Sequence, residues 1–261
     1  GRAPSLPAMR KLLILLCQPS QVLGLQPLPS WAATFGIDTG VKHTVGGRQY
    51  ARARVGAYMG LKIITSHLAP RALGGYLCNL TPEQFRRDWW DRLPSKMTGA
   101  EFLSRYGETD DLVTTVDPAE TYSVRGCTSY PIYETARVRK FVELLTQASE
   151  TGDERPLVRA GRLMYAAHWG YRTLLGLGAT ETDLIMRLVR KRGPKHGLYG
   201  AKTSGGGSGG TMAILARADA NEAVEEVADE YARRTGLQPH LFVGSSPGTL
   251  AFGLRRVNLQ A

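Results

Sequence analysis

The sequence predicts an α+β fold in which helices lie on one side of a mainly antiparallel sheet. Short apolar runs between proline and glycine breaks predict strands near both ends of the chain, and amphipathic segments predict helices between them. This order fits helices packed against one sheet. With 261 residues, 43% of them hydrophobic, the chain can bury a sizeable core.

The segment 11–45 predicts three strands. Its runs KLLILLCQ, VLGLQPL and ATFGIDTGV are apolar or alternating, and Pro-Ser, Pro-Leu-Pro-Ser and Gly-Gly breaks follow them in turn. After Gly46 and Gly47 the apolar spacing becomes that of an amphipathic helix. We expect this helix to continue to about His67.

Capping signals place the next helices. Thr81 before Pro82 predicts a helix through the two tryptophans at 89–90, and Thr98 with Glu101 forms a capping-box pattern before another. We expect Pro131 to open a long helix that ends before a loop at 150–156. Further helices are expected at 157–174, within 178–193 with Thr180 or Thr182 as cap, and at 220–236. Strands are expected at 198–217 around a glycine loop, at 240–246 and at 251–257.

The charge balance is basic. Lys and Arg number 33 against 23 Asp and Glu, a net charge of +10, which could serve a nucleic acid, an anionic ligand or an acidic partner. The basic residues are spread along the chain except for a short cluster at 187–196, which a solvated helix end explains. Aromatic residues do not alternate with basic ones on any predicted strand, so we do not expect nucleic-acid binding.

The cysteine and apolar patterns indicate a cytoplasmic protein without a membrane segment. The three cysteines are far apart and form no CxxC or His/Cys spacing, so we expect reduced thiols and no metal site. The apolar run at 12–16 is shorter than an export core and far shorter than a membrane span. We expect the five histidines to be structural.

The glycine loop between residues 198 and 217 is the strongest local signal. Five of the six residues from Gly205 to Gly210 are glycine. A GxGxxG match is present, but a strand follows where a dinucleotide site needs a helix, and Ala201 breaks the phosphate-loop pattern. Two alternatives remain, a structural hairpin or a loop whose N–H groups line an anion pocket.

The wider string LYGAKTSGGGSGGTMAI resembles the third signature motif of the GHMP small-molecule kinases, in their galactokinase and L-arabinokinase branch. The segments 36–60, 176–189 and 244–253 are also similar to that branch, so the resemblance spans roughly residues 11–256. It implies a ferredoxin-like GHMP C-terminal domain at 46–261, with residues 1–45 as remnant strands of the N-terminal domain.

The resemblance implies transfer of the ATP γ-phosphate to the anomeric hydroxyl of a free sugar. A complete kinase of this type has a sugar-holding motif near its N-terminus, a Gly-Ser-Ser triphosphate loop and an aspartate base, and none of the three matches a string of this chain. We therefore assign no catalytic residue here. ATP and Mg²⁺ would both need the N-terminal half, and the chain is expected to be inactive alone.

The resemblance also assigns secondary roles to individual residues. Tyr50 matches the tyrosine that contacts the sugar, although a core tyrosine is an alternative. Lys42 takes the place of a basic residue near the phosphates. Arg54 is expected to bond to the glycine-rich turn, and Asp38 and His43 receive no chemistry. The residues that would support the triphosphate loop are Gly205, Gly206, Gly207, Ser208, Gly209 and Gly210.

Two functions of different classes stay open. One is a sugar kinase half, whose partner is the N-terminal half or another protein that covers residues 11–45, since unpaired strand edges recruit partners. The other is a non-catalytic structural or adaptor subunit of a larger assembly, which the net charge of +10 and the unmatched first residues favour. The sequence does not identify the sugar.

Overall fold

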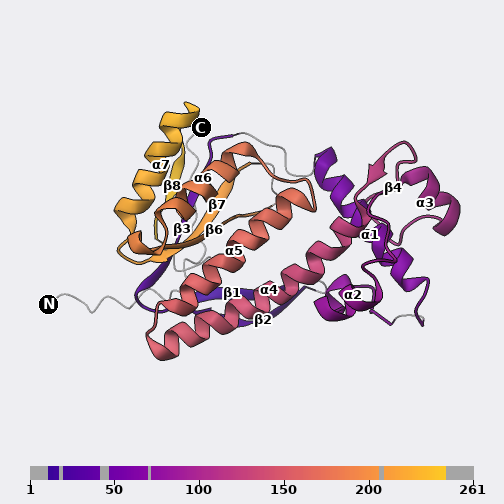
Figure 1. Ribbon diagram of the computed structural model, residues 1–261, viewed down its shortest axis with the longest axis horizontal. Coiled ribbons are helices and arrows are strands. Elements are labelled where there is room, and N and C mark those ends of the chain that lie inside the picture. The colour runs from indigo at the N-terminus through magenta and orange to yellow at the C-terminus, as the bar shows by residue number, and fades with distance from the viewer. Residues whose placement is uncertain (1–10, 18–19, 42–46, 70–71, 206–208, 245–261) are drawn as a thin grey trace, which may run out of the picture.

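The computed structural model describes residues 11–17, 20–41, 47–69, 72–205 and 209–244, and it confirms the α+β fold class (Figure 1). A four-stranded antiparallel sheet has the order β6-β7-β3-β8. Its strands are β3 (Ala32–Asp38), β6 (Leu198–Thr203), β7 (Thr211–Arg217) and β8 (His240–Phe242). The predicted strand at 251–257 lies outside the described residues.

Two smaller sheets complete the strands of the described residues. Strands β1 (Lys11–Cys17) and β2 (Ser20–Pro27) form an antiparallel ribbon, and β4 (Met97–Thr98) pairs with β5 (Thr121–Tyr122). The domain boundary at residue 45 stays a prediction, but the main sheet crosses it. Strand β3 is hydrogen-bonded along its whole length to β7, so it belongs to the same sheet as the C-terminal strands.

The helices follow the predicted order. Their bounds are α1 (Arg48–Thr65), α2 (Pro82–Asp88), α3 (Gly99–Tyr106), α4 (Val124–Thr151), α5 (Arg155–Thr173), α6 (Thr180–Arg192) and α7 (Asn221–Thr235). The predicted cap of α2 is confirmed, because the Thr81 hydroxyl accepts from the N–H of Gln84, and the Gln84 side chain also accepts from the N–H of Thr81, which completes a capping box. Thr98 caps α3 by accepting from the N–H of Glu101.

One predicted helix start and one predicted helix cap are wrong. Helix α4 begins at Val124 and contains Pro131 in its interior, where proline removes one helical hydrogen bond. Packing outweighs that loss, since Val124, Thr128 and Ile132 are all buried. Helix α6 has Ala179 at its cap position and no side-chain cap, because the Thr182 hydroxyl donates backwards to the Ala179 carbonyl.

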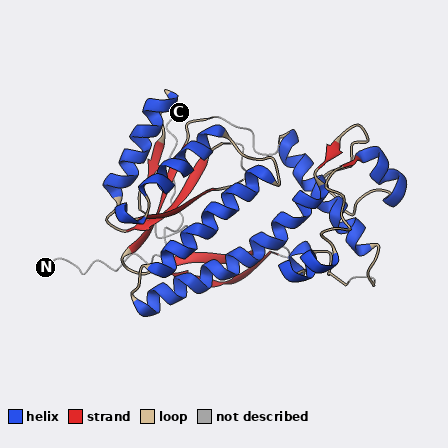
Figure 2. Cartoon of the chain, in the orientation of Figure 1, coloured by secondary structure: helices blue, strands red, loops and turns tan. Residues whose placement is uncertain are grey.

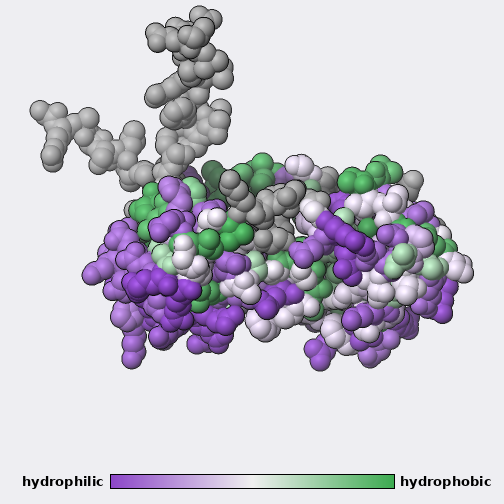
Figure 3. Space-filling model, turned by 90° about the horizontal axis from the view of Figure 1, so that it is seen from above, coloured by the Kyte–Doolittle hydropathy of each residue, from purple (hydrophilic) through white to green (hydrophobic). Residues whose placement is uncertain are grey.

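The helices divide the core into packed layers (Figure 2). Helices α6 and α7 pack on the sheet through a cluster that contains Ile185, Val227 and Ile214. A second cluster joins α4 and α5 to Tyr199 and Leu215 of the sheet. The third surrounds α1 to α4, at the end of the molecule away from the main sheet (Figure 1). Figure 3 shows that hydrophilic side chains at the surface are interspersed with hydrophobic patches.

Helix α5 and strand β6 approach each other through glycines. A Cβ at Gly161 would lie 1.9 Å from the Tyr199 carbonyl oxygen, and a Cβ at Gly200 would lie 2.4 Å from the Gly161 Cα. Both obstacles are backbone atoms, which cannot move aside as a side chain can. Any side chain at either position would therefore push the helix away from the strand.

We expect Gly161→Ala to lower the free energy of unfolding by about 2–3 kcal/mol, because overpacking a fixed backbone contact displaces α5. Urea unfolding followed by circular dichroism measures this. Arg159→Ala, at an exposed position of the same helix, is the control and should change stability by less than about 0.5 kcal/mol. Equal stability of Gly161→Ala and the control would contradict the contact.

Candidate functional site

The glycine loop forms the turn of the β6–β7 hairpin. Gly205, Gly209 and Gly210 have φ values of +72°, +120° and +77°, a range that side chains other than glycine rarely adopt. Ser204 and Gly205 are exposed, and a Cβ added at Gly205 would meet no atom within 4 Å. The loop thus presents open backbone at Gly205, whereas Gly209 and Gly210 are buried and residues 206–208 lie outside the described residues.

Strand β3 holds β7, the second strand of the hairpin. The Asp38 carboxylate accepts from the Thr211 hydroxyl at 3.0 Å and from the N–H of Gly40 at 2.9 Å. The N–H of Thr39 donates to the Gly210 carbonyl at 3.1 Å. Asp38, for which no chemical role was predicted, therefore fixes the loop end through hydrogen bonds that its carboxylate accepts.

Tyr171 of α5 bonds the hairpin at the end of β6. The Tyr171 hydroxyl donates to the Gly205 carbonyl at 3.1 Å, and its ring packs edge-on against Tyr130 at 5.5 Å between centroids. Burial, with smaller contributions from Tyr50 and Glu134, raises the pKa of Tyr171. Tyr50 is therefore close to the tyrosine that bonds the loop. It is 42% exposed, which argues against a core role.

A buried histidine fixes the end of β6. The N–H of Thr203 donates to His168 Nδ1 at 3.3 Å, and a backbone N–H can only donate, so Nδ1 carries no proton. The proton is then on Nε2, which donates to Asp183 Oδ1 at 3.0 Å. The Thr203 hydroxyl lies 2.9 Å from the same Nδ1. His168 is 1% exposed, so it is structural, as predicted for the histidines.

The charges around His168 favour its neutral form. Burial lowers its pKa to about 4, helped by the positive charges of Arg172 and Lys202. Asp183 would favour the charged form, but the guanidinium of Arg172 already pairs with the other Asp183 oxygen, and Arg187 lies 3.8 Å from it. His168 is thus a neutral hydrogen-bonding link between α5, α6 and the base of the hairpin.

The hydrogen bonds of Arg54 within the described residues go to Asp111 and Tyr58, so its predicted bond to the glycine-rich turn stays a prediction. Its guanidinium makes two hydrogen bonds of 2.7 Å to Asp111, whose side chain is 1% exposed. This contact holds the pKa of Asp111 well below its usual range. Asp111 also accepts from the N–H of Val113 and the hydroxyl of Thr114, so Arg54 fixes the segment between α3 and β5 to α1.

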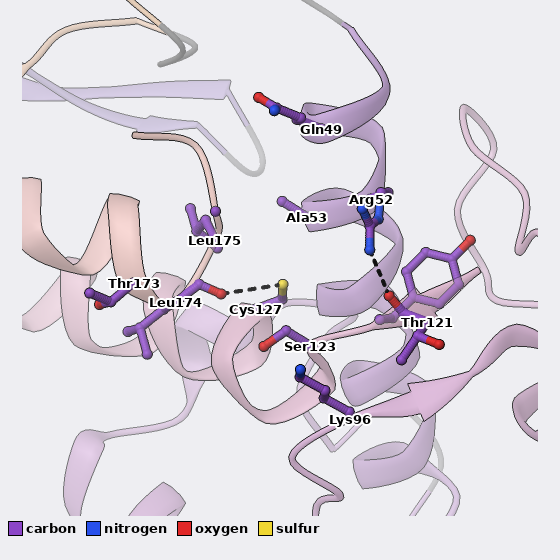
Figure 4. A pocket seen from close by; sticks show the side chains of 12 residues that line it. Gln49, Arg52, Ala53, Lys96, Thr121, Ser123, Cys127, Thr173, Leu174 and Leu175 are labelled. Carbon is purple, nitrogen blue, oxygen red and sulfur yellow. Dashed lines mark hydrogen bonds between the residues drawn. The ribbon is translucent and has the colours of Figure 1, made fainter. Parts of the chain in front are cut away.

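A pocket of about 330 Å³ has residues in its lining, Gln49 and Thr173, that are near Tyr50 and Tyr171 in the sequence (Figure 4). Gln49 and Arg52 of α1, Cys127 of α4 and Leu174 after α5 are among its lining residues. The Cys127 thiol donates to the Leu174 carbonyl at 3.8 Å, and burial raises its pKa to about 11. This cysteine is therefore a neutral thiol at physiological pH and not a nucleophile.

The predicted site residues are only partly brought together. Tyr171 bonds Gly205 and interacts electrostatically with Tyr50, whereas Lys42, Gly206, Gly207 and Ser208 lie outside the described residues. Among the residues that the structure describes, no three His, Cys, Asp or Glu side chains converge as metal ligands. None of the described helices is long and apolar enough to cross a membrane.

The comparisons with known proteins agree on one family. The family description "GHMP kinases C terminal" matches residues 141–233. The L-arabinokinase of Arabidopsis thaliana is 39% identical over 282 residues, which cover 95% of this chain and 27% of that protein. The galactokinase of Thermotoga maritima is 26% identical over 181 residues, which cover 64% of this chain and 47% of that protein.

A solved structure supports the fold. The galactokinase of Lactococcus lactis, crystallised with galactose, has a TM-score of 0.66 and 17% identity, and the match covers 90% of this chain and 50% of that one. This likeness shows the fold alone. The relatives confirm the resemblance predicted from the glycine string, and the chain spans about a quarter to a half of the length of those named here.

We expect the stability of the protein to fall as the pH drops from about 6.5 to about 4. In this window the unfolded chain protonates His168 at its ordinary pKa of 6.5, whereas the folded chain does so only near 4. The linked loss is up to about 3 kcal/mol, because each pKa unit corresponds to about 1.4 kcal/mol. Urea unfolding at a series of pH values measures it.

The control is His168→Gln, which keeps hydrogen-bonding groups but has no titration in this window. Its free energy of unfolding should change less between pH 6.5 and 4 than that of the wild type. Parallel pH curves for the two proteins would contradict a neutral buried His168.

Proposed function

The chain carries a GHMP kinase C-terminal domain, and we propose that it is the C-terminal half of a kinase that transfers the γ-phosphate of ATP to the anomeric hydroxyl of a free sugar. One observation carries the proposal. The glycine hairpin is held at both strands, presents open backbone at Gly205, and accepts there a hydrogen bond from Tyr171, whose hydroxyl interacts electrostatically with Tyr50. Positioning of this kind is the main protein contribution to phosphoryl transfer.

Tyr50, the glycine hairpin and the residues that hold it have different roles in this proposal. Tyr50 offers an exposed ring and hydroxyl, which suit stacking and one hydrogen bond to a sugar. The hairpin supports the triphosphate-binding loop from the other half of the kinase. Tyr171 and His168 act indirectly, since they hold the hairpin and have no free group to offer a substrate.

ATP and Mg²⁺ are proposed ligands of the complete kinase. The described residues bring no carboxylate cluster together that fits Mg²⁺, so we derive no step through the metal here. Within the proposal, the remaining part of the kinase supplies the metal ligands, the base and the groups that select the sugar. We also propose a cytoplasmic location, which the three free cysteines support.

The β1–β2 ribbon offers a surface for that remaining part. Leu13 faces Leu25 across the two strands, and Leu15 faces Val22, with exposed fractions between 50% and 63%. The opposite face of the ribbon packs through Leu12 on the cluster of α4 and α5. We propose that the N-terminal half of the kinase, or another protein, covers the exposed face.

Kinase assays of the chain with and without an N-terminal half test the function. The chain alone should give no ATP-dependent phosphorylation of L-arabinose or galactose. A fusion to the part of Arabidopsis L-arabinokinase that precedes the matched region should give turnover. Turnover by the chain alone would contradict the half-site proposal, and a folded but inactive fusion would contradict the kinase proposal.

In that fusion, Tyr50→Phe should raise the KM for the sugar about threefold to tenfold with a smaller change in kcat, because one hydrogen bond to substrate is lost. Tyr58→Phe, two helical turns further along α1, is the matched control and should leave the KM unchanged. The Tyr58 ring lies against the guanidinium of Arg54. Equal effects at the two positions would remove Tyr50 from the sugar site.

We expect the paired substitution Leu13→Glu with Leu25→Lys to weaken association with a separately produced N-terminal half by about tenfold or more. The two new side chains face each other with opposite charge, so the ribbon is retained while its apolar face is lost. Isothermal titration calorimetry measures the affinity. Leu112→Lys, at a fully exposed loop position, is the control, and a loss as large as that of the pair would contradict the assignment.

A further inference from the structure

A second pocket, of about 450 Å³, lies at the opposite end of β6 from the glycine hairpin. Helix α5 forms one wall, and the C-terminal end of α6 with the following Gly193 and Pro194 forms another (Figure 1). Tyr199, at the start of β6, lies in the lining. This second pocket shares no lining residue with the first pocket, which Gln49, Arg52 and Cys127 help to line.

Three aromatic residues, Tyr165, Trp169 and Tyr199, contribute to the walls of this pocket. Trp169 lines it and is 56% exposed, an unusual exposure for a large aromatic ring on a helix with a buried face. The ring of Tyr165 lies beside it in the lining, and the Tyr165 hydroxyl is buried with no hydrogen-bond partner among the described residues. Burial raises the pKa of Tyr165 to about 12, so this hydroxyl keeps its proton.

Two arginines contribute positive charge to the same pocket. Arg162 of α5 and Arg190 of α6 line it, and neither forms an ion pair with a carboxylate in the part of the chain that the structure describes. The guanidinium of Arg190 lies 5.8 Å from the centre of the Tyr165 ring. Arg192 of the same basic cluster differs, because it pairs with Glu226 and Glu230.

This combination is typical of a small-molecule site. Such sites are concave, measure about 300–1,000 Å³, and have mostly apolar and aromatic linings with a few polar groups that fix orientation. Exposed tryptophan rings stack on flat faces of ligands, and guanidinium groups bind phosphate through two parallel hydrogen bonds. A simple solvated helix end needs neither the aromatic wall nor the concave shape.

We propose that this pocket binds a small phosphorylated ligand that contains a ring. The ring packs on Trp169, and Arg162 and Arg190 bind the phosphate. Two classes of ligand carry both a ring and a phosphate: a nucleotide, with a planar base, and a sugar phosphate, with a puckered ring. The inference is independent of the proposed kinase function, because neither the glycine turn nor Asp38, Tyr171 and His168, which hold it, line this pocket.

Nuclear magnetic resonance of the ¹⁵N-labelled chain tests the proposal directly. The indole N–H signal of Trp169 is assigned with Trp169→Phe and followed during titrations with adenosine 5′-monophosphate, glucose 1-phosphate, adenosine and inorganic phosphate. At least one of the two phosphorylated rings should shift this signal with saturation. Adenosine and phosphate alone should bind at least tenfold more weakly, and the better phosphorylated ring identifies the source.

Variants separate the pocket from binding elsewhere. Trp169→Ala should weaken binding of the preferred probe at least tenfold, measured by calorimetry, and Arg190→Ala should do the same. Arg159→Ala removes an equal charge from the same helix outside the lining and should leave the affinity within twofold. No saturable shift of the Trp169 signal up to about 10 mM of either phosphorylated probe, or equal losses in Arg159→Ala and Arg190→Ala, overturns the proposal.

Discussion

The close approach of α5 to β6 is the constraint on which the rest of the structure depends. Gly161 and Gly200 let the two backbones meet where any side chain would separate them. At this distance His168 reaches the backbone of Thr203, and Tyr171 reaches the carbonyl of Gly205. A helix held even a methyl group further away would lose both hydrogen bonds, and the hairpin would lose its fixed first arm.

The charge state of His168 explains why its hydrogen bonds to Thr203 and Asp183 are stable near neutral pH. A charged imidazolium could not accept the hydrogen bond from Thr203, because both its nitrogens would carry protons. Burial and the nearby cations Arg172 and Lys202 keep the ring neutral. Asp183 then accepts from the ring while its second oxygen pairs with Arg172, so the buried carboxylate is compensated without charging the histidine.

Sequence patterns predicted what local physics controls. The glycine string, the Thr81 cap and the amphipathic spacing of α1 depend on neighbouring residues, and the structure contains each of them. His168 and Asp183 could not be paired in advance, since they lie on different helices and meet only through packing. The predicted start of α4 at Pro131 was wrong for the same reason. Local rules place proline at a helix start, but buried contacts keep α4 helical across Pro131.

The same reasoning explains why only part of the candidate site was predictable and why the described residues leave it open. A glycine hairpin reveals its backbone freedom in the sequence, whereas the supports from Asp38, Tyr171 and His168 come from three distant segments. These supports hold the described ends of the loop by hydrogen bonds, and a Cβ added at Gly205 would meet no atom within 4 Å. Backbone that is held in place and open on one side favours preorganised binding, since little ordering entropy is left to lose when a partner loop or a phosphate approaches.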